Sequence, residues 1–299
     1  MNVVITGGSG FIGSRLSELL LEAGHQVTVV DVNESCIGDV YMIRRDILHI
    51  KPKEWKDILR CNDVIVHAAC VVGVNNYDAD VSKSVLTSNQ IDANIIRAVT
   101  DSDIKLIYFS TSEVYGDCTD VVESHQLTIG SPVEHNRWGY ACNKLMSEFL
   151  IRCSNIPAVI IRPFNVTGLG QGRESGMVVP MFVDSVVRGL DINIYGTGEQ
   201  IRTFCDIRDA VKMIHLLMDD EHLGQTYNIG NHNNIISMND LAVKVKQLTG
   251  GSCDIINTPR NCIFTSQVPD INIRIPNTNK INRVYTPQYS IDDIITSML

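Results

Sequence analysis

The first thirteen residues constrain the fold of this chain more than any other stretch. Residues 3–5 are Val-Val-Ile, an apolar and mostly β-branched run that is typical of a buried strand in a parallel sheet. Gly7, Gly10 and Gly13 follow at a spacing of three residues, and an amphipathic helical pattern begins directly after them. Such glycines let the main chain approach a phosphate group closely. The stretch therefore predicts a strand, a tight turn and a helix whose amino end can bind phosphate.

A second β-branched run extends this pattern. Gln26 to Val30 is expected to form a strand, and Asp31 follows it about 20 residues beyond the glycines. A carboxylate at this position can hydrogen-bond the ribose 2′-hydroxyl of NAD, and it would repel the 2′-phosphate of NADP. Glycines alone also fit a tight turn in any α/β protein. Strand, glycines, helix and acidic residue together indicate a dinucleotide-binding unit, with NAD as the cofactor.

The composition narrows the class of protein. The 299 residues suffice for one large domain or two interleaved ones, and the formal net charge of -9 argues against a general nucleic-acid-binding surface. The nine cysteines are scattered without a C-x-x-C pair, so we expect buried, reduced thiols in a cytosolic protein and no structural metal. No stretch is long enough for a membrane span, and the N-terminus reads as a strand rather than a signal peptide.

Strand and helix patterns alternate through the first half of the chain. Further strands are expected at Tyr41–Arg45, Val64–Ala68, Lys105–Ser110 and Ala158–Arg162, and helices near Glu54–Cys61, Ala79–Thr100 and Trp138–Ser154. This alternation predicts an α/β fold, a Rossmann doubly wound parallel sheet with helices on both faces. Ligands bind at the carboxyl ends of the strands in such sheets.

The pattern changes after Arg162. Helices are expected at Met177–Leu190, Asp206–Met218 and Ser237–Thr249 and from Ser290 onward, and strands at Ile192–Tyr195 and Thr226–Ile229. Loops and short strands are expected in residues 250–287. We assign residues 1–162 to an NAD-binding domain to which residues 199–220 return. Residues 163–198 and 221–299 are assigned to a smaller α/β substrate-binding region.

Two stretches carry groups suited to proton transfer. The strand at residues 105–109 is followed by the hydroxyl-rich run Ser110-Thr-Ser-Glu-Val-Tyr-Gly116. Tyr140 and Lys144 lie four residues apart, on one face of a predicted helix. A nearby ammonium lowers the pKa of a phenol, so Tyr140 could take a proton from a sugar hydroxyl while hydride leaves the same carbon. The alternative is an exposed helix pair without function.

These stretches resemble the extended short-chain dehydrogenase/reductases, specifically the NAD-dependent nucleotide-sugar epimerase/dehydratase group. The resemblance runs nearly from end to end. It rests on TGGSGFIG at 6–13, VVD at 29–31, RDI at 45–47, HAA at 67–69, VGV at 72–74, STSEVYG at 110–116, RWGYACNK at 137–144, RPFNVTG at 162–168, GMVVPMFV at 176–183, YGTGEQIRTFCDIRDA at 195–210, YNIG at 227–230 and RIPN at 274–277.

The resemblance implies roles for matching residues. Those implied to bind NAD are Gly7, Gly10, Phe11, Ile12, Gly13, Asp31, Asp46, Ile47, Ala68, Ala69, Asn89, Ser110, Tyr140, Lys144 and Pro163. Those implied to act in catalysis are Thr111, Ser112, Glu113, Tyr140 as the base and Lys144. Those implied to bind a nucleotide-diphosphate sugar are Val74, Thr111, Asn165, Val179, Arg202 and Arg274. Two guanidinium groups suit a diphosphate.

The motifs resemble those of enzymes that catalyse different reactions. Related 4,6-dehydratases carry Thr-Asp-Glu where this chain has Thr111-Ser112-Glu113, so dehydration is disfavoured. STSEVYG looks like the motif of UDP-glucuronate decarboxylases, whereas GMVVPMFV and RWGYACNK look more like UDP-sugar 4-epimerases. We expect a UDP-sugar 4-epimerase that works through a 4-keto-sugar, with UDP-glucuronate decarboxylation as the alternative. A protein that binds NAD without turnover is a third reading, which the pairing of Tyr140 with Lys144 argues against.

The resemblance also implies a homodimer. The helices at Ala79–Thr100 and Trp138–Ser154 would pair with their two-fold copies in a four-helix bundle. Leu145, Phe149 and Leu150 fit either that contact face or the core of the monomer.

Overall fold

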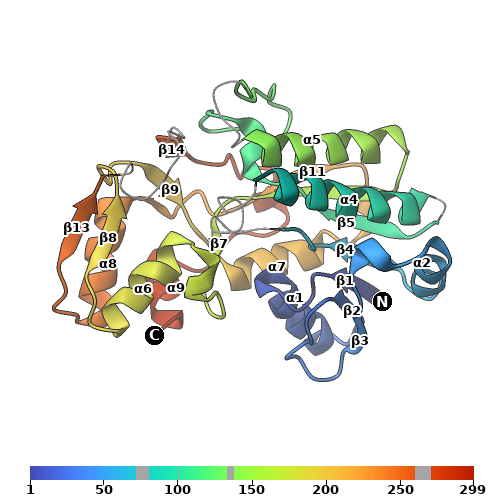
Figure 1. Ribbon diagram of the computed structural model, residues 1–299, viewed down its shortest axis with the longest axis horizontal. Helices are drawn as coiled ribbons and strands as arrows, with labels where there is room; N and C mark the ends of the chain where they lie inside the picture. Colours follow the sequence, from blue (N-terminus) through green and yellow to red (C-terminus); the bar gives the residue numbers. More distant parts are fainter. Residues whose placement is uncertain (72–80, 101, 133–137, 260–270) are drawn as a thin grey trace.

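A parallel sheet organises the larger part of the protein. The computed structural model describes residues 1–71, 81–100, 102–132, 138–259 and 271–299 (Figure 1). Its seven-stranded sheet has the order β11-β6-β5-β4-β1-β2-β3, and all neighbouring strands are parallel. The strands are β1 (Asn2–Thr6), β2 (Gln26–Asp31), β3 (Tyr41–Arg44), β4 (Val64–His67), β5 (Lys105–Phe109), β6 (Ala158–Pro163) and β11 (Thr226–Ile229). The strand order reverses between β1 and β4, where doubly wound sheets bind their ligands.

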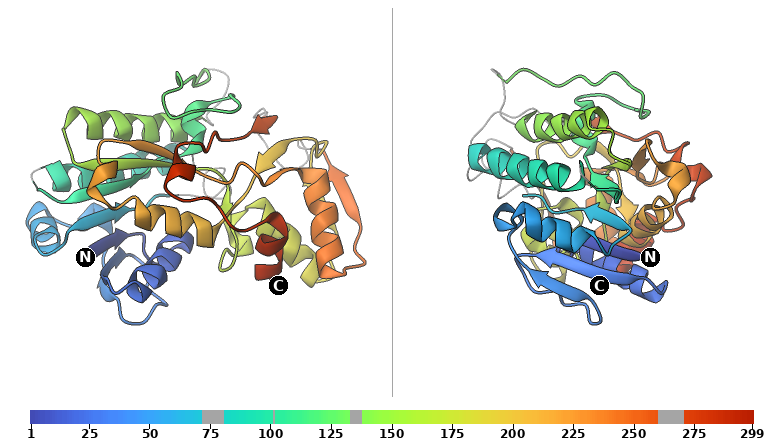
Figure 2. Two further views of the ribbon diagram at one scale, coloured as in Figure 1. Left: turned by 180° about the vertical axis from the view of Figure 1, so that it is seen from behind. Right: turned by 90° about the vertical axis from the view of Figure 1, so that its right-hand side faces the viewer.

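Helices cover both faces of this sheet. On one face, α1 (Phe11–Glu22) and α7 (Ile207–Leu216) pack together over a core that includes Leu16 and Met213. The opposite face is covered by α2 (Pro52–Leu59), α4 (Val81–Thr100) and α5 (Trp138–Cys153), which bury a second core. Helices α4 and α5 lie side by side, as Figure 2 shows in teal and green. The prediction of a doubly wound α/β fold is confirmed.

A smaller part is built from short strands and three helices. One sheet pairs β8 (Ile192–Tyr195) with β13 (Ile255–Thr258), and another has the order β12-β9-β14. The remaining elements are β7 (Val166–Thr167), β9 (Ile201–Thr203), β10 (Cys205–Asp206), β12 (Ile235–Ser237), β14 (Ile273–Arg274), α6 (Val178–Val187), α8 (Met238–Thr249) and α9 (Ile291–Ser297). Five 3-10 turns are described: η1 (Ile47–His49), η2 (Ser112–Tyr115), η3 (Arg173–Ser175), η4 (Asp220–His222) and η6 (Ile281–Arg283).

Capping groups set several helix ends. Ser237 and Ser290 begin α8 and α9 as predicted, because their side chains accept hydrogen bonds from main-chain N–H groups three residues later. Helix α2 begins two residues before the predicted Glu54, since Pro52 suits the first turn and Glu54 accepts the N–H of Lys51 at 2.9 Å. Helix α6 is shorter than predicted at both ends. The other predicted ends agree with the structure within two residues, and the predicted start at Ala79 lies outside the described residues.

The chain crosses between the two parts more often than the predicted division allows. Thr226–Ile229, assigned above to the smaller part, forms the edge strand of the seven-stranded sheet beside β6. Ile201–Thr203, assigned to the larger part, lies between β12 and β14 in the smaller part. Ile281 is fully buried against the core beneath α1 and α7. The division therefore needs correction at these three segments, because β11 and Ile281 contribute to the core of the large sheet and β9 pairs with strands of the smaller part.

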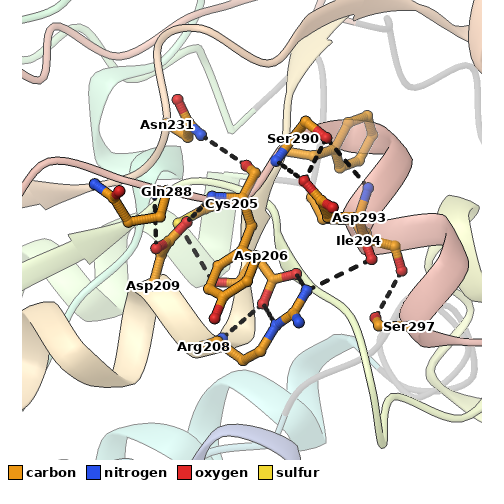
Figure 3. A network of polar contacts seen from close by, with 12 residues as sticks. Cys205, Asp206, Arg208, Asp209, Asn231, Gln288, Ser290, Asp293, Ile294 and Ser297 are labelled. Carbon is orange, nitrogen blue, oxygen red and sulfur yellow. Dashed lines mark hydrogen bonds and ion pairs between the residues drawn. The ribbon is translucent and has the colours of Figure 1, made fainter.

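A polar network joins α7 to the C-terminal segment (Figure 3). Asp206 caps α7 and forms an ion pair with Arg208 at 2.8 Å, and Arg208 donates to the main-chain oxygen of Asp293. Asp209 accepts the main-chain N–H groups of residues 288–289. Both aspartates are fully buried, so their contacts hold the segment from Gln288 to Asp293 against the start of α7.

The cysteines are free but mostly not buried. Among the eight in the described residues, only Cys205 and Cys253 are buried, so the prediction of buried thiols is wrong for the others. Cys142 and Cys153 are exposed because they lie on the outer face of α5. No helix within the described ranges is long and apolar enough to cross a membrane.

Candidate active site

The glycine turn between β1 and α1 has the close packing that fits a phosphate. Gly7 has a φ of +73°, and a Cβ atom there would lie 2.7 Å from the main-chain nitrogen of Ala69. A Cβ atom on Gly13 would lie 2.2 Å from the carbonyl oxygen of Gly7. Gly10 is the N-cap of α1 and offers no side-chain acceptor, so the first-turn N–H groups at Phe11 and Ile12 are left for a ligand.

The acidic residue after β2 lies over this turn. One carboxylate oxygen of Asp31 accepts the N–H of Ser9 at 3.0 Å, and the other accepts the N–H of Asn33 at 2.9 Å. Asp46 caps η1 by accepting the N–H of Leu48, and Ile47 is buried beside it. Ala68 and Ala69 follow β4 and pack against Gly7. These residues meet where the strand order reverses, and their contacts with NAD stay predictions.

We expect the protein to bind NAD more tightly than NADP. The carboxylate of Asp31 would repel the 2′-phosphate by about 1–3 kcal/mol at this partly buried position. Titration calorimetry with both cofactors measures the difference between the binding free energies of NAD and NADP. In the Asp31→Asn variant this difference should be smaller. Equal affinity of the unaltered protein for NAD and NADP would contradict the role given to Asp31.

Helix α4 buries a row of polar residues beside the site. Asn89 on α4 is exposed in the single chain, and its contact with the cofactor stays a prediction. Helical periodicity buries Ser84, Ser88 and Asp92, which are four residues apart. Ser88 lies 3.4 Å from the sulfur of Cys70, which follows β4. Val74, predicted to bind substrate, lies outside the described residues.

Lys144 is buried and charged at the centre of the site. Its Nζ atom lies 3.4 Å from both carboxylate oxygens of Asp92. Burial acts to lower the pKa of Lys144, but the electrostatic interactions with Asp92, and less strongly with Cys70, Tyr108 and Tyr140, together outweigh it and raise this pKa well above its ordinary value. Tyr140, one turn earlier on α5, is partly buried and interacts electrostatically with Lys144. The structure thus brings together the predicted pair, and it adds Asp92.

A buried arginine meets the hydroxyl-rich loop after β5. Arg274, on β14, is 4% exposed. Its Nη1 atom donates to the Ser112 hydroxyl at 3.3 Å and lies 3.2 Å from a carboxylate oxygen of Glu113. Thr111 caps η2 by accepting the N–H of Glu113. The predicted catalytic loop and one predicted substrate arginine therefore form a single cluster.

The hydroxyl of Ser110 has a protein partner. It donates to Glu148 on α5, whose carboxylate forms an ion pair with Arg162 at 2.6 Å. Arg162 also donates to the phenol oxygen of Tyr115 at 2.8 Å. Burial raises the pKa of Tyr115 to about 12, although Arg162 opposes the shift. This network fixes the loop from β5 to η2, and sequence reasoning missed Glu148 and Arg162 as its members.

The other predicted substrate residues differ in what they offer. Arg202 on β9 is in register with Arg274 on β14, so the two side chains share one face of the sheet. Asn165 has a φ of +40° and donates to the carbonyl oxygen of Thr203 at 2.8 Å. Val179 is buried in the core of the smaller part, so only its main chain could meet a nucleotide. Pro163 ends β6.

The described ranges contain no group of three or more His, Cys, Asp or Glu residues arranged to hold a metal ion. The side chains above offer a phenol beside a buried ammonium, hydroxyl groups at a strand end, and a buried guanidinium. With the glycine turn, this set suits proton removal from a substrate held next to a dinucleotide.

Comparison with known proteins agrees with this assignment. Residues 3–230 match the model of the NAD dependent epimerase/dehydratase family. A UDP-N-acetyl-alpha-D-glucosaminuronate decarboxylase from Bacillus cytotoxicus is 31% identical over 294 residues, covering 94% of this chain and 90% of that protein. UDP-D-apiose/UDP-D-xylose synthase 2 of Arabidopsis thaliana is 27% identical, covering 100% and 90%.

Solved structures show the same fold. UDP-glucuronic acid 4-epimerase from Bacillus cereus, in complex with UDP-glucuronic acid and NAD, has a TM-score of 0.86 at 23% identity, covering 99% of this chain and 97% of that chain. UDP-glucose 4-epimerase from Thermotoga maritima has a TM-score of 0.85 at 22% identity, covering 100% and 97%. The family match spans most of the sequence and includes the glycine turn and the Tyr140–Lys144 pair, so this protein is an enzyme of the NAD-dependent epimerase/dehydratase family.

Proposed function

We propose that this enzyme oxidises C4 of a UDP-linked uronic acid and then releases its carboxylate as carbon dioxide. The observation that carries the proposal is the buried position of Arg274 against Ser112 and Glu113. A guanidinium group binds a carboxylate through charge-assisted, paired hydrogen bonds. A UDP-linked neutral hexose offers a guanidinium group only its diphosphate, whereas a UDP-linked uronic acid also offers a carboxylate. The decarboxylase relative, whose printed name gives it a uronic acid substrate, supports this choice.

The side chains fit the first half of this reaction. Tyr140 takes the proton of the C4 hydroxyl, and the ammonium of Lys144 favours its phenolate form. The glycine turn and Lys144 would hold NAD, which when bound supplies the hydride acceptor. The hydroxyl of Thr111 or Ser112 donates a hydrogen bond to the sugar oxygen. Oxidation places a keto group at C4. This carbon is bonded to C5, which carries the carboxylate.

This arrangement makes carbon dioxide a good leaving group. The C5–C6 bond breaks, and its electron pair moves to C5 and onto the C4 oxygen as an enolate. Tyr140 and the loop hydroxyls stabilise that negative charge. C5 then takes up a proton, hydride returns to C4, and the sugar leaves one carbon shorter. Arg274 holds the carboxylate before the bond breaks, and Glu113 balances the guanidinium charge once carbon dioxide has gone.

The second candidate is the 4-epimerase expected from the sequence. The Bacillus cereus enzyme of the same fold is named as a UDP-glucuronic acid 4-epimerase, so a uronic acid is also compatible with that reaction. Both reactions use Tyr140, Lys144 and NAD, and both pass through a 4-keto-sugar. They diverge only afterwards, when the keto-sugar either turns over in the site or loses its carboxylate.

Product analysis separates the candidates. The purified protein is incubated with NAD and with UDP-glucuronic acid, UDP-N-acetylglucosaminuronic acid, UDP-glucose or UDP-N-acetylglucosamine, and products are identified by mass spectrometry and NMR. We expect loss of carbon dioxide from a uronic acid substrate. An unchanged mass with inversion at C4 would instead establish the epimerase. Turnover of only the neutral sugars would contradict the role of Arg274.

We further propose that the enzyme is a homodimer that pairs α4 and α5 with their two-fold copies. The two helices present exposed apolar side chains, Leu86 on α4 and Met146, Phe149 and Leu150 on α5. Leu145, by contrast, packs against a buried cluster of the monomer. A second copy of this chain would bring the same apolar face and form a four-helix bundle.

Phe149→Glu should convert this dimer into a monomer. Phe149 is 61% exposed in the single chain. In the variant, each of the two chains would bury an unpaired glutamate in the interface. Sedimentation at micromolar concentration gives the mass of the species. Val187→Glu on α6 is the control, since Val187 is equally apolar and exposed but lies far from α5 in the fold. A monomeric unaltered protein would end the proposal.

We also propose that the enzyme works in the cytoplasm. The eight cysteines in the described residues are all free thiols, and four of them are exposed. Exposed free thiols suit a compartment whose redox systems keep cysteine reduced.

A further inference from the structure

Asp92 is a buried carboxylate that accepts contacts from three sides. It is 1% exposed and lies on α4. The phenol of Tyr108 on β5 donates to it at 2.6 Å, and the hydroxyl of Ser147 on α5 donates at 2.9 Å. The Nζ atom of Lys144 lies 3.4 Å from each carboxylate oxygen. These donors, together with His67 on β4, fill the lone-pair positions of an ionised carboxylate.

The contact with His67 is also that of an ionised carboxylate. The Nε2 atom of His67 lies 3.1 Å from Asp92, and Nδ1 lies 2.6 Å from the hydroxyl of Thr6 on β1. Burial lowers the pKa of His67, although Asp92 opposes the shift, so the ring is neutral. A neutral ring must carry its proton on Nε2 to reach an acceptor, and Nδ1 then accepts the Thr6 hydroxyl.

Among the described residues, one close carboxylate faces Lys144. The groups that face its ammonium are Asp92 from α4, the Tyr108 ring at 4.9 Å from β5, the Cys70 thiol after β4, His67 from β4 and Tyr140 on its own helix. Asp92 is the carboxylate of this set, so it balances the buried ammonium. A buried lysine without such a partner loses its proton readily.

We propose that Asp92 is a positioning residue, which fixes the ammonium of Lys144 and keeps it charged so that it can contact the ribose of NAD. The inference rests on the proposed binding of NAD by Lys144. Asp92 reaches the cofactor only through that lysine. Its anchoring by β4, β5 and α5 keeps the ammonium in one place whether or not NAD is bound.

The test replaces the carboxylate by an amide of the same shape. In Asp92→Asn, the proton of Lys144 should be lost at lower pH, because burial is no longer opposed by a negative charge. NMR of protein labelled at lysine Cε follows this titration, with Lys144→Gln identifying the signal. NAD affinity, measured by calorimetry, should weaken roughly tenfold between about pH 6.5 and 9 in Asp92→Asn and stay level in the unaltered protein.

Asp209→Asn is the matched control. Asp209 is also a buried, hydrogen-bonded carboxylate, as Figure 3 shows, but it lies on α7, which covers the opposite face of the sheet from α4. This variant should lose stability without moving the titration of Lys144 or the pH dependence of NAD affinity. If Asp92→Asn behaves in the same way, Asp92 is only structural and the proposal fails.

If Asp92→Asn does not fold, a double variant tests the proposal instead. Asp92→Asn combined with Lys144→Gln leaves no unpaired buried charge. Recovery of folding in this double variant would support the coupling of the two residues, and continued failure would overturn it. The NMR titration needs neither substrate nor cofactor. An unaltered protein that binds no NAD would therefore refute the proposed function while the titration still decides the role of Asp92.

Discussion

Tyr140→Phe is expected to lower turnover by roughly 10²–10⁴-fold, or about 3–5 kcal/mol of barrier, while the fold and NAD binding stay intact. The change removes one oxygen atom and keeps the ring, so packing along α5 hardly changes. It removes the group that accepts the C4 proton as hydride departs. Single-turnover reduction of bound NAD, followed by the absorbance of the reduced nicotinamide, isolates this step.

Lys144→Ala gives the contrasting result. Its ammonium is expected to contact the ribose of NAD, so this variant should lose cofactor affinity as well as rate. Tyr41→Phe serves as the control, because Tyr41 is an exposed tyrosine on the edge strand β3. If Tyr140→Phe reduces bound NAD as fast as the unaltered enzyme, Tyr140 is not the base.

Arg274→Gln is expected to cost roughly 10²–10³-fold in kcat/KM on a UDP-uronic acid. Truncating one partner of a buried, hydrogen-bonded charge pair costs about 2–5 kcal/mol. Here the loss falls on the substrate carboxylate, and Glu113 loses the ion pair it has in the free enzyme. Initial rates on a uronic acid and on a neutral UDP-sugar measure the change, and the neutral sugar should be affected far less.

Arg202→Gln is the matched comparison for this variant. The two arginines are neighbours in register on β9 and β14, but Arg202 donates to main-chain oxygens of Ile201 and Asn272 and not to the catalytic loop. If Arg202 serves the diphosphate, its loss should weaken uronic and neutral substrates alike. Equal effects of Arg274→Gln on both substrate types would show that Arg274 also serves the diphosphate.

Local patterns predicted most of the fold. The glycine spacing predicted β1, the turn and α1, because Gly10 and Gly13 pack against the main chain of the turn itself. Ser237 and Ser290 marked helix starts for the same reason, since a cap contacts main-chain groups three residues away. The family match confirms the resemblance and the cofactor, NAD.

The sequence analysis missed residues whose role depends on packing. The inward face of α4 carries Ser88. Asp92 lies on that same face, and the spacing of Ser84, Ser88 and Asp92 was the sequence signal that could have revealed a polar inner stripe. Glu148 and Arg162 gave no local sequence signal. Their burial is explained by the ion pair between them, which joins α5 to β6.

The interleaving of the two parts has a consequence for synthesis on the ribosome. The outermost strand of the large sheet, β11, ends at residue 229, and Ile281 is needed to close the core behind it. An emerging chain therefore holds β6 with an unpaired edge until nearly four-fifths of the sequence has been made, and unpaired edges invite association with other chains. The large part cannot finish folding before the small one exists, so the two must mature together as one late, cooperative event.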